Sequence, residues 1–253
     1  MVLPDKIGFV GTGAITDAIV RGLMIEPAAV PEIVVSPRNA ESAGKLAAEF
    51  AAVWVAADNQ TVVDTCDVVV LAVRPQIAEE VIRSLHFQEG QTVISVIAAT
   101  GRPALLDCIG ADVQLAQAIP LPFVSKRKGT TAIYPPDPVT AAIFNVLGNA
   151  VECGTTEEYN LLAAASALMA TYFGIMQRTT EWLARKGLPE EKARAYLAPL
   201  FAELSQTALA AGVDVPFNKL SREFATKGGL KGSEQEQSEI VRGFYQPKTA
   251  TFL

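Results

Sequence analysis

Two glycines near the start of the chain have the spacing of a phosphate-binding turn. The segment Gly11-Thr-Gly-Ala-Ile-Thr16 follows a short apolar run, Ile7–Val10, and leads into residues with helical spacing, Ala14–Met24. A glycine at 11 permits a tight turn, and a glycine at 13 lets the backbone approach a pyrophosphate, which the helix N-terminus attracts. Thr16 stands where such turns have their last small residue, so helix and strand must pack around a larger group. The segment predicts dinucleotide binding by Gly11, Gly13, Ala14 and Ile15.

The end of the next apolar run indicates which dinucleotide is bound. Ile33–Val35 is followed by Ser36-Pro-Arg-Asn39 and not by an acidic residue. An Asp or Glu at this point suits the free ribose hydroxyl of NAD, whereas a hydroxyl, an amide and an Arg suit the additional phosphate of NADP. We therefore expect NADP as the cofactor, with Ser36 and Arg38 at its 2′-phosphate.

Alternating strand and helix patterns predict the sheet that presents this turn. Helices are expected at Ala40–Phe50 and Gln76–Leu85, the second opened by Pro75 at a position that proline suits. This βαβαβ order is typical of a doubly wound, Rossmann-type sheet, which binds ligands at the carboxyl ends of its strands. Strands are expected at Val53–Ala56, Cys66–Ala72, Thr92–Ile97 and Val113–Ile119, with edge strands at Thr130–Tyr134 and Ala150–Cys153. Further cofactor contacts are therefore expected at Ala72, Val73, Arg74, Pro75 and Ile97.

From Thr155 onward the pattern is helical. Leu161–Met176 is apolar on all faces, which predicts a helix buried on all sides. This run has 16 residues and is interrupted by Ser166 and Thr171, which makes it short for a membrane span. A domain of about 100 residues cannot easily bury such a helix alone. We predict a dinucleotide-binding domain at 1–154 and an all-helical domain at 155–253 that mediates dimerisation.

The composition narrows the class of partner. The 253 residues are 50% hydrophobic and 19% charged, with a net charge of −6, which disfavours nucleic acid or an anionic membrane as the main partner. The one basic cluster, Lys126–Lys128, is expected to be a solvated loop. Three cysteines without C-x-x-C spacing and a single histidine predict neither a disulfide framework nor a metal site. No secretion signal is expected, so we predict a cytoplasmic protein with a small-molecule substrate.

With these segments placed, the chain resembles the pyrroline-5-carboxylate reductase family over roughly its full length. The shared stretches include Ile7–Ile15, Leu71–Gln76 and Ser95–Ala98. In the helical half, Glu181–Pro189 looks like that family's E-A-L-x-x-x-G-L-P stretch. The resemblance implies NADPH-dependent reduction of a cyclic imine in proline biosynthesis, and an intertwined homodimer that often assembles further.

The departures from the family pattern lie at the substrate end. The family's M-P-N-T-P is Ile119–Phe123 here, with Leu121 in place of the asparagine. S-G-S-G-P-A-Y has become Ser166–Tyr172, and S-P-G-G-T-T has become Thr226–Lys231. The resemblance implies substrate contacts at Ser166, Gly228 and Gly229, and catalytic contacts at Lys231, Thr226 and Tyr172.

The roles of Lys231 and Tyr172 can each be interpreted in two ways. Lys231 would repel an iminium cation, but it could hold a carboxylate or donate a proton to a carbonyl; alternatively it faces water and Thr226 closes the site. Tyr172 donates a hydrogen bond into the site or is simply part of the core. The sequence thus predicts an NADPH-dependent reductase of a cyclic imine or related small substrate. The alternative is a catalytically altered or inactive dinucleotide-binding protein with a sensing or partner role.

Overall fold

The computed structural model describes residues 3–26 and 28–224 of the chain. The chain divides into two compact units between Ala165 and Ser166. The first unit contains nearly all of helix α7 (Thr156–Ser166), which follows the domain boundary predicted after residue 154. Tyr159 explains this division, because its ring is buried against Ala132 and Cys153 of the first unit.

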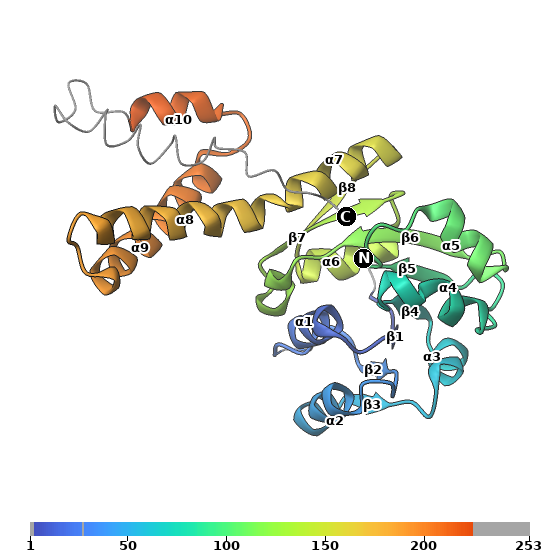
Figure 1. The fold of residues 1–253 in the computed structure, drawn as a ribbon. Coiled ribbons are helices and arrows are strands. Elements are labelled where there is room, and N and C mark those ends of the chain that lie inside the picture. Colours follow the sequence, from blue (N-terminus) through green and yellow to red (C-terminus); the bar gives the residue numbers. More distant parts are fainter. Residues whose placement is uncertain (1–2, 27, 225–253) are drawn as a thin grey trace. The chain divides into compact units, whose positions relative to one another are not determined.

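The first unit is built on one eight-stranded sheet with the order β3-β2-β1-β4-β5-β6-β7-β8 (Figure 1). Neighbouring strands are parallel except for the antiparallel pair β6–β7. This arrangement confirms the predicted doubly wound sheet. Of the two strands predicted as edges, only β8 lies at the edge of the sheet, because β7 pairs with both β6 and β8. The strands are β1 Lys6–Val10, β2 Glu32–Val35, β3 Val53–Val55, β4 Val68–Leu71, β5 Thr92–Ser95, β6 Gln114–Ile119, β7 Gly129–Tyr134 and β8 Gly148–Glu152.

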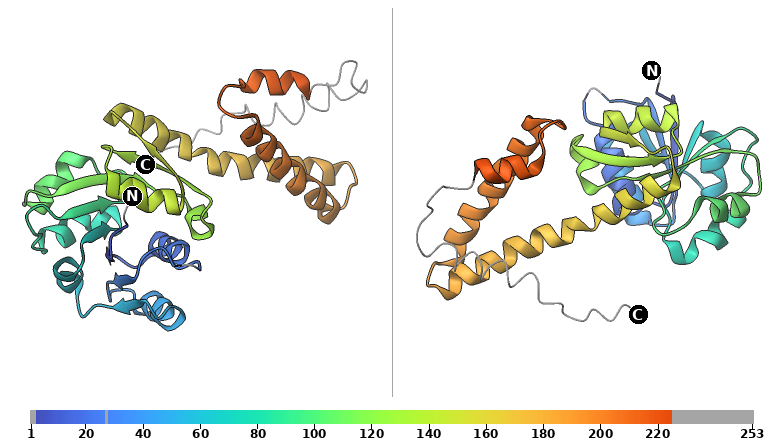
Figure 2. Two further views of the ribbon diagram at one scale, coloured as in Figure 1. Left: turned by 180° about the vertical axis from the view of Figure 1, so that it is seen from behind. Right: turned by 90° about the horizontal axis from the view of Figure 1, so that it is seen from above.

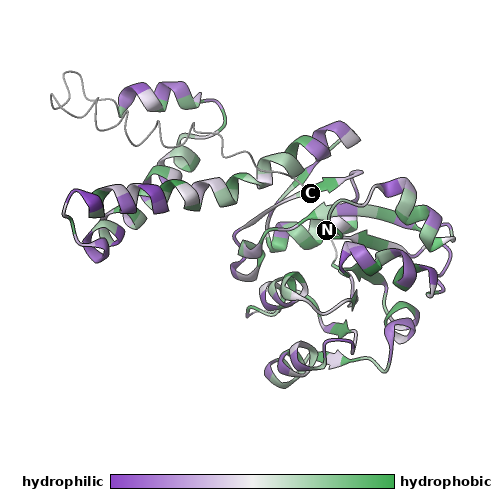
Figure 3. Ribbon diagram, viewed as in Figure 1, coloured by the Kyte–Doolittle hydropathy of each residue, from purple (hydrophilic) through white to green (hydrophobic). Residues whose placement is uncertain are grey.

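Helices cover both faces of the sheet, and each face has its own apolar core (Figure 2). The central strands between the layers are mainly hydrophobic, and β4 is a run of buried Val and Leu (Figure 3). Side chains of Asn39, Asp58 and Asp137 accept backbone N–H bonds at the starts of three helices, which fixes where these begin. One face carries α1 Ala14–Leu23, α2 Ala40–Glu49, the 3-10 helix η1 Pro122–Lys126 and α6 Pro138–Val146; the other carries α3 Asn59–Thr65, α4 Pro75–Arg83 and α5 Arg102–Ile109.

The second unit is helical where the structure describes it, as predicted. It contains α8 Leu168–Arg185, α9 Glu190–Ala211 and α10 Phe217–Glu223, and α8 packs along α9. The rest of the all-helical domain predicted at 155–253, residues 225–253, lies outside the described residues. By length and composition alone, the helical stretch Thr156–Arg185 is apolar enough to cross a membrane. Within this single chain several large apolar side chains of the helices are exposed, among them Leu161, Leu168, Phe173, Tyr196, Leu209 and Phe217.

Arg127 holds the segment after β6 against the end of α1. Its guanidinium donates hydrogen bonds to the carbonyls of Gly22 at 2.9 Å, Leu23 at 3.4 Å and Ile25 at 2.9 Å. Gly22 allows this close approach, because any side chain there would collide with the carbonyl of Val124 in η1. The basic cluster is therefore not simply a solvated loop, since its central residue binds the carboxyl end of a helix.

We expect Arg127→Met to lower the free energy of unfolding by about 2 kcal/mol, because hydrogen bonds from a charged donor are lost and the helix carbonyls stay half-buried. Urea denaturation would measure the change. Lys128→Met is the control: this neighbouring side chain is exposed, so its replacement should alter stability by less than about 0.5 kcal/mol. Equal effects of the two substitutions would show that the guanidinium contacts contribute nothing.

Candidate dinucleotide-binding site

The cofactor residues predicted in the first unit come together at one edge of the sheet. The strands β2, β1, β4 and β5 are consecutive and parallel, so their carboxyl ends lie side by side (Figure 1). Each predicted group directly follows one of these ends. Gly11, Gly13, Ala14 and Ile15 follow β1; Ser36 and Arg38 follow β2; Ala72, Val73, Arg74 and Pro75 follow β4; Ile97 follows β5.

The two glycines of the turn have different structural roles. Gly11 has a φ of +104°, and a Cβ there would lie 2.6 Å from the Ala72 carbonyl oxygen. Gly13 is the N-cap residue of α1 with an ordinary extended backbone, and no atom of the described residues lies within 4 Å of where its Cβ would be. In residues 3–26 and 28–224, no side chain caps the first N–H groups of α1. The open space and uncapped helix N-terminus fit the phosphates of a dinucleotide.

Buried hydroxyls surround Gly11. Thr16 is fully buried, and its Oγ1 donates a hydrogen bond to the Gly11 carbonyl at 2.6 Å. Ser36 is also fully buried, and its Oγ accepts a hydrogen bond from the Gly11 N–H at 2.9 Å. Sequence reasoning treated Thr16 only as a larger group to be packed and missed this bond, although a hydroxyl residue at a normally small position was the available signal.

Arg38 follows the carboxyl end of β2, at the same edge of the sheet as the Gly11 turn. Its side chain is exposed beyond the end of β2, and within residues 3–26 and 28–224 it forms no ion pair or hydrogen bond. An exposed guanidinium at this edge of the sheet suits bidentate binding of a phosphate. Ser36, predicted for the same phosphate, instead has its hydroxyl turned to Gly11.

The loop after β5 forms the other side of this edge. Ile97 is buried, and Ala99 adopts a left-handed backbone with φ of 56°, which costs about 1–2 kcal/mol for a residue with a Cβ. The amide of the buried Gln117 donates to the Thr100 carbonyl at 2.8 Å and holds the loop in place. The side chains at 98 and 99 are small and exposed.

The substrate and catalytic residues predicted from the family pattern belong to the second unit. Ser166 ends α7 and Tyr172 lies in α8. The Tyr172 ring packs edge-on against Phe173 and Phe201, with centroids 5.4 and 5.5 Å apart, which is a packing contact. The remaining four residues, Thr226, Gly228, Gly229 and Lys231, lie outside the described residues. All six assignments stay predictions.

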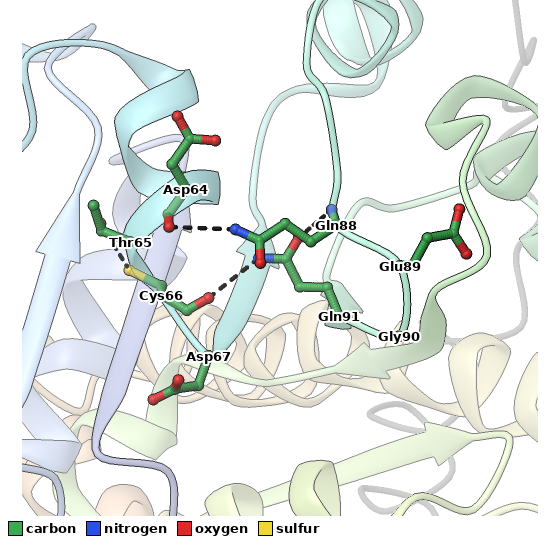
Figure 4. Close-up of a pocket in the computed structure, with 8 residues that line it drawn as sticks. All are labelled: Asp64, Thr65, Cys66, Asp67, Gln88, Glu89, Gly90 and Gln91. Atoms are coloured by element: carbon green, nitrogen blue, oxygen red, sulfur yellow. Dashed lines mark hydrogen bonds between the residues drawn. The ribbon is translucent and has the colours of Figure 1, made fainter.

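A pocket of about 240 Å³ lies at the opposite edge of the sheet, before β4 and β5 (Figure 4). It is lined by residues 64–67 and 88–91. Gln91 donates to the carbonyls of Val63 at 2.8 Å and Cys66 at 3.2 Å, which ties its two walls together. Burial raises the pKa of the Cys66 thiol to about 11, so this cysteine stays protonated and unreactive at neutral pH. The pocket is therefore separate from the strand ends that carry the predicted dinucleotide residues, and its cysteine is not a nucleophile.

Comparison with known proteins finds similar sequences and structures along most of the chain. Residues 6–99 match a family described as "NADP oxidoreductase coenzyme F420-dependent". The pyrroline-5-carboxylate reductase of Pseudomonas aeruginosa is 26% identical over 219 residues, covering 83% of this chain and 80% of its own. The solved pyrroline-5-carboxylate reductase of Coxiella burnetii has a TM-score of 0.78 and 21% identity, covering 95% of this chain and 93% of its own. That of Plasmodium falciparum, with NADP bound, has a TM-score of 0.73 and 17% identity, covering 95% of this chain and 91% of its own. The two structures share the fold.

Proposed function

We infer that this chain, which belongs to the pyrroline-5-carboxylate reductase family, is an NADPH-dependent reductase of a cyclic imine or a related small substrate. The observation that carries the proposal is the turn at Gly13, where neither a side-chain cap on α1 nor an atom within 4 Å of a Cβ is found among the described residues. The NADP in the Plasmodium falciparum relative supports the choice of cofactor. When bound, NADPH supplies a hydride to the carbon of the imine.

The residues of the first unit bind and orient the cofactor. The turn from Gly11 to Gly13 and the start of α1 would hold the pyrophosphate, and Arg38 would hold the 2′-phosphate. The ends of β4 and β5, at Ala72–Pro75 and Ile97–Thr100, would flank the ring that reacts. A protonated imine is already electrophilic, so the protein chiefly positions the two reactants and excludes water. This chemistry does not require a histidine at the site.

The test of the proposal is consumption of NADPH in the presence of candidate substrates. The wild-type protein would be mixed with NADPH and, in turn, with cyclic imines and keto acids of different sizes at several pH values. We expect loss of NADPH absorbance with at least one cyclic imine. Tight NADPH binding without turnover of any compound would instead support the alternative of a dinucleotide-binding protein without catalysis.

Arg38 is expected to determine the preference for NADPH. A charge-assisted contact with the 2′-phosphate contributes roughly 1.5–3 kcal/mol, or about ten- to a hundredfold in affinity. Arg38→Ala should therefore weaken NADPH binding by that factor and leave NADH binding nearly unchanged, as measured by calorimetric titration. Lys45→Ala removes a nearby surface cation from α2 that pairs with Glu41, and it should change neither affinity. Equal affinity of the wild type for both cofactors would refute the assignment.

We further propose that a second copy of this chain covers the exposed apolar side chains of the helices, giving a homodimer. Leu168 and Phe173 are more than 60% exposed on α8 although the helix is apolar, which is the expected pattern at a subunit interface. A cytoplasmic location fits the three cysteines, which are free thiols.

Sedimentation should show a dimer at micromolar concentration. Phe173→Glu should weaken the dimer at least tenfold, because a twofold interface places the buried charge in both copies. Val55→Glu is the matched control, since this valine is also exposed but lies on edge strand β3 of the first unit. A wild-type monomer, or equal weakening by both substitutions, would contradict the proposal.

A further inference from the structure

We propose that Thr16 and Ser36 are positioning residues for the cofactor, which hold Gly11 in the conformation that binds the pyrophosphate, and that Arg38 alone recognises the 2′-phosphate. This inference rests on the proposed use of NADPH. It assigns to two buried hydroxyls a role that their residue types alone do not indicate.

Gly11 depends on these hydroxyls for its hydrogen bonds. It lies just beyond the last residue of β1, so the sheet does not pair its N–H or its carbonyl. The Ser36 hydroxyl accepts a hydrogen bond from the N–H at 2.9 Å, and the Thr16 hydroxyl donates one to the carbonyl at 2.6 Å. Within the described part of the chain, no backbone bond offers either group another partner. The two side chains therefore bond the N–H and the carbonyl of the same residue, and together they fix the orientation of the turn.

A second set of bonds holds Ser36 itself. Its backbone N–H donates to the Phe9 carbonyl at 3.0 Å, and its carbonyl accepts from the Thr12 hydroxyl at 2.8 Å. The side-chain amide of Asn39 donates to the Thr12 carbonyl at 3.1 Å. The turn after β1 and the chain after β2 thus form one network. The network sets the position of the backbone that carries Arg38 relative to the phosphate turn.

Burial separates the roles of Ser36 and Arg38. Ser36 and Thr16 have no exposed surface, so their hydroxyls can act on a ligand only through the groups they bond. These are Gly11 for both and, for Ser36, also the Thr12 hydroxyl at 3.3 Å. The pyrophosphate is common to NADPH and NADH, whereas the 2′-phosphate is present only in NADPH. Loss of a positioning hydroxyl should therefore lower the affinities for NADPH and NADH by the same factor. Loss of a group that touches the 2′-phosphate should lower the affinity for NADPH alone.

The test uses three variants of the full chain and calorimetric titration with NADPH and NADH. Thr16→Val removes the hydroxyl and keeps the shape, Thr16→Ser keeps the hydroxyl, and Ser36→Ala removes the partner of the Gly11 N–H. We expect Thr16→Val and Ser36→Ala to bind each cofactor about five- to tenfold more weakly, which is the worth of one hydrogen bond. The ratio of the two affinities should stay within about twofold of the wild type. Thr16→Ser should bind almost as the wild type does.

Gln91→Leu controls for a general loss of stability. This buried amide holds two carbonyls at the opposite edge of the sheet (Figure 4), so its loss should lower the melting temperature without changing either affinity. Unchanged affinities in Thr16→Val would overturn the inference, as would a fall in NADPH affinity alone in Ser36→Ala. If Thr16→Val does not fold, Ser36→Ala decides. A wild type that binds neither dinucleotide would overturn the proposed function, and the inference with it.

Discussion

Gly13→Ala is expected to weaken NADPH binding about ten- to a hundredfold and to leave the stability of the fold unchanged. The backbone of Gly13 has φ of −100°, which any residue can adopt, and a Cβ there would have no neighbour within 4 Å in the part of the chain that the structure describes. The free protein therefore accepts the methyl group without strain. In the complex the same methyl group stands where a phosphate must approach the N–H groups of α1, whose charge-assisted bonds contribute roughly 1.5–3 kcal/mol.

Gly11→Ala is the matched comparison, because the same methyl group is added two residues earlier. Here the backbone is left-handed and the new Cβ would lie 2.6 Å from the Ala72 carbonyl oxygen and 2.9 Å from the Val73 nitrogen. Strain and overpacking together should lower the free energy of unfolding by about 3 kcal/mol or more. Urea denaturation and NADPH titration of both variants separate the effects. Wild-type affinity in Gly13→Ala would mean that the phosphates do not bind at this turn.

Pyrroline-5-carboxylate itself is expected to be a weak substrate, although NADPH binds. Against the family pattern, Leu121 replaces an asparagine, and Lys231 replaces the threonine whose hydroxyl the resemblance implies would contact the imine nitrogen. Two like charges about 4 Å apart cost about 4 kcal/mol at an effective dielectric constant of ~20, which exceeds a hundredfold in rate. A larger or neutral imine, or one with a carboxylate placed to meet the lysine, should be reduced faster.

Steady-state rates of the wild type and Lys231→Thr with pyrroline-5-carboxylate measure this effect. The substitution should raise kcat/KM by at least a hundredfold, because it removes the positive charge and restores a hydroxyl. Lys219→Thr, on the exposed helix α10, is the control and should leave the rate unchanged. Efficient reduction by the wild type that does not change in Lys231→Thr would show that Lys231 faces water and that Thr226 closes the site.

The sequence predicted the sheet well because its signals are local. Buried strands such as Val68–Leu71 form apolar runs, and the glycine turn follows the first of them directly. Helices α3 and α5 were missed because they span only seven and eight residues and show little apolar periodicity. The apolar run Leu161–Met176 was expected to be buried on all sides, yet one chain leaves Leu161 and Phe173 exposed. Burial by a partner leaves the same sequence pattern as burial within a chain.

The details of the site were less predictable than its location. The order of the strands brings Gly11, Arg38 and Ile97 to one edge, as the alternating pattern indicated. The hydroxyl bond from Thr16 to Gly11 depends on the distance between a helix and the strand before it, which no residue pattern reports. The prediction that Ser36 contacts the 2′-phosphate could not take its burial into account, because the burial of a side chain is set by neighbours far along the chain.

Transfer of isotope from cofactor to product tests the central claim most directly. The wild-type protein would be incubated with NADPH that carries deuterium at both C4 positions and with the cyclic imine that consumes NADPH fastest. Mass spectrometry of the product amine should show one deuterium, on the ring carbon of the former C=N bond. An amine without deuterium, or no amine although NADPH binds, would contradict the account of this protein as an imine reductase.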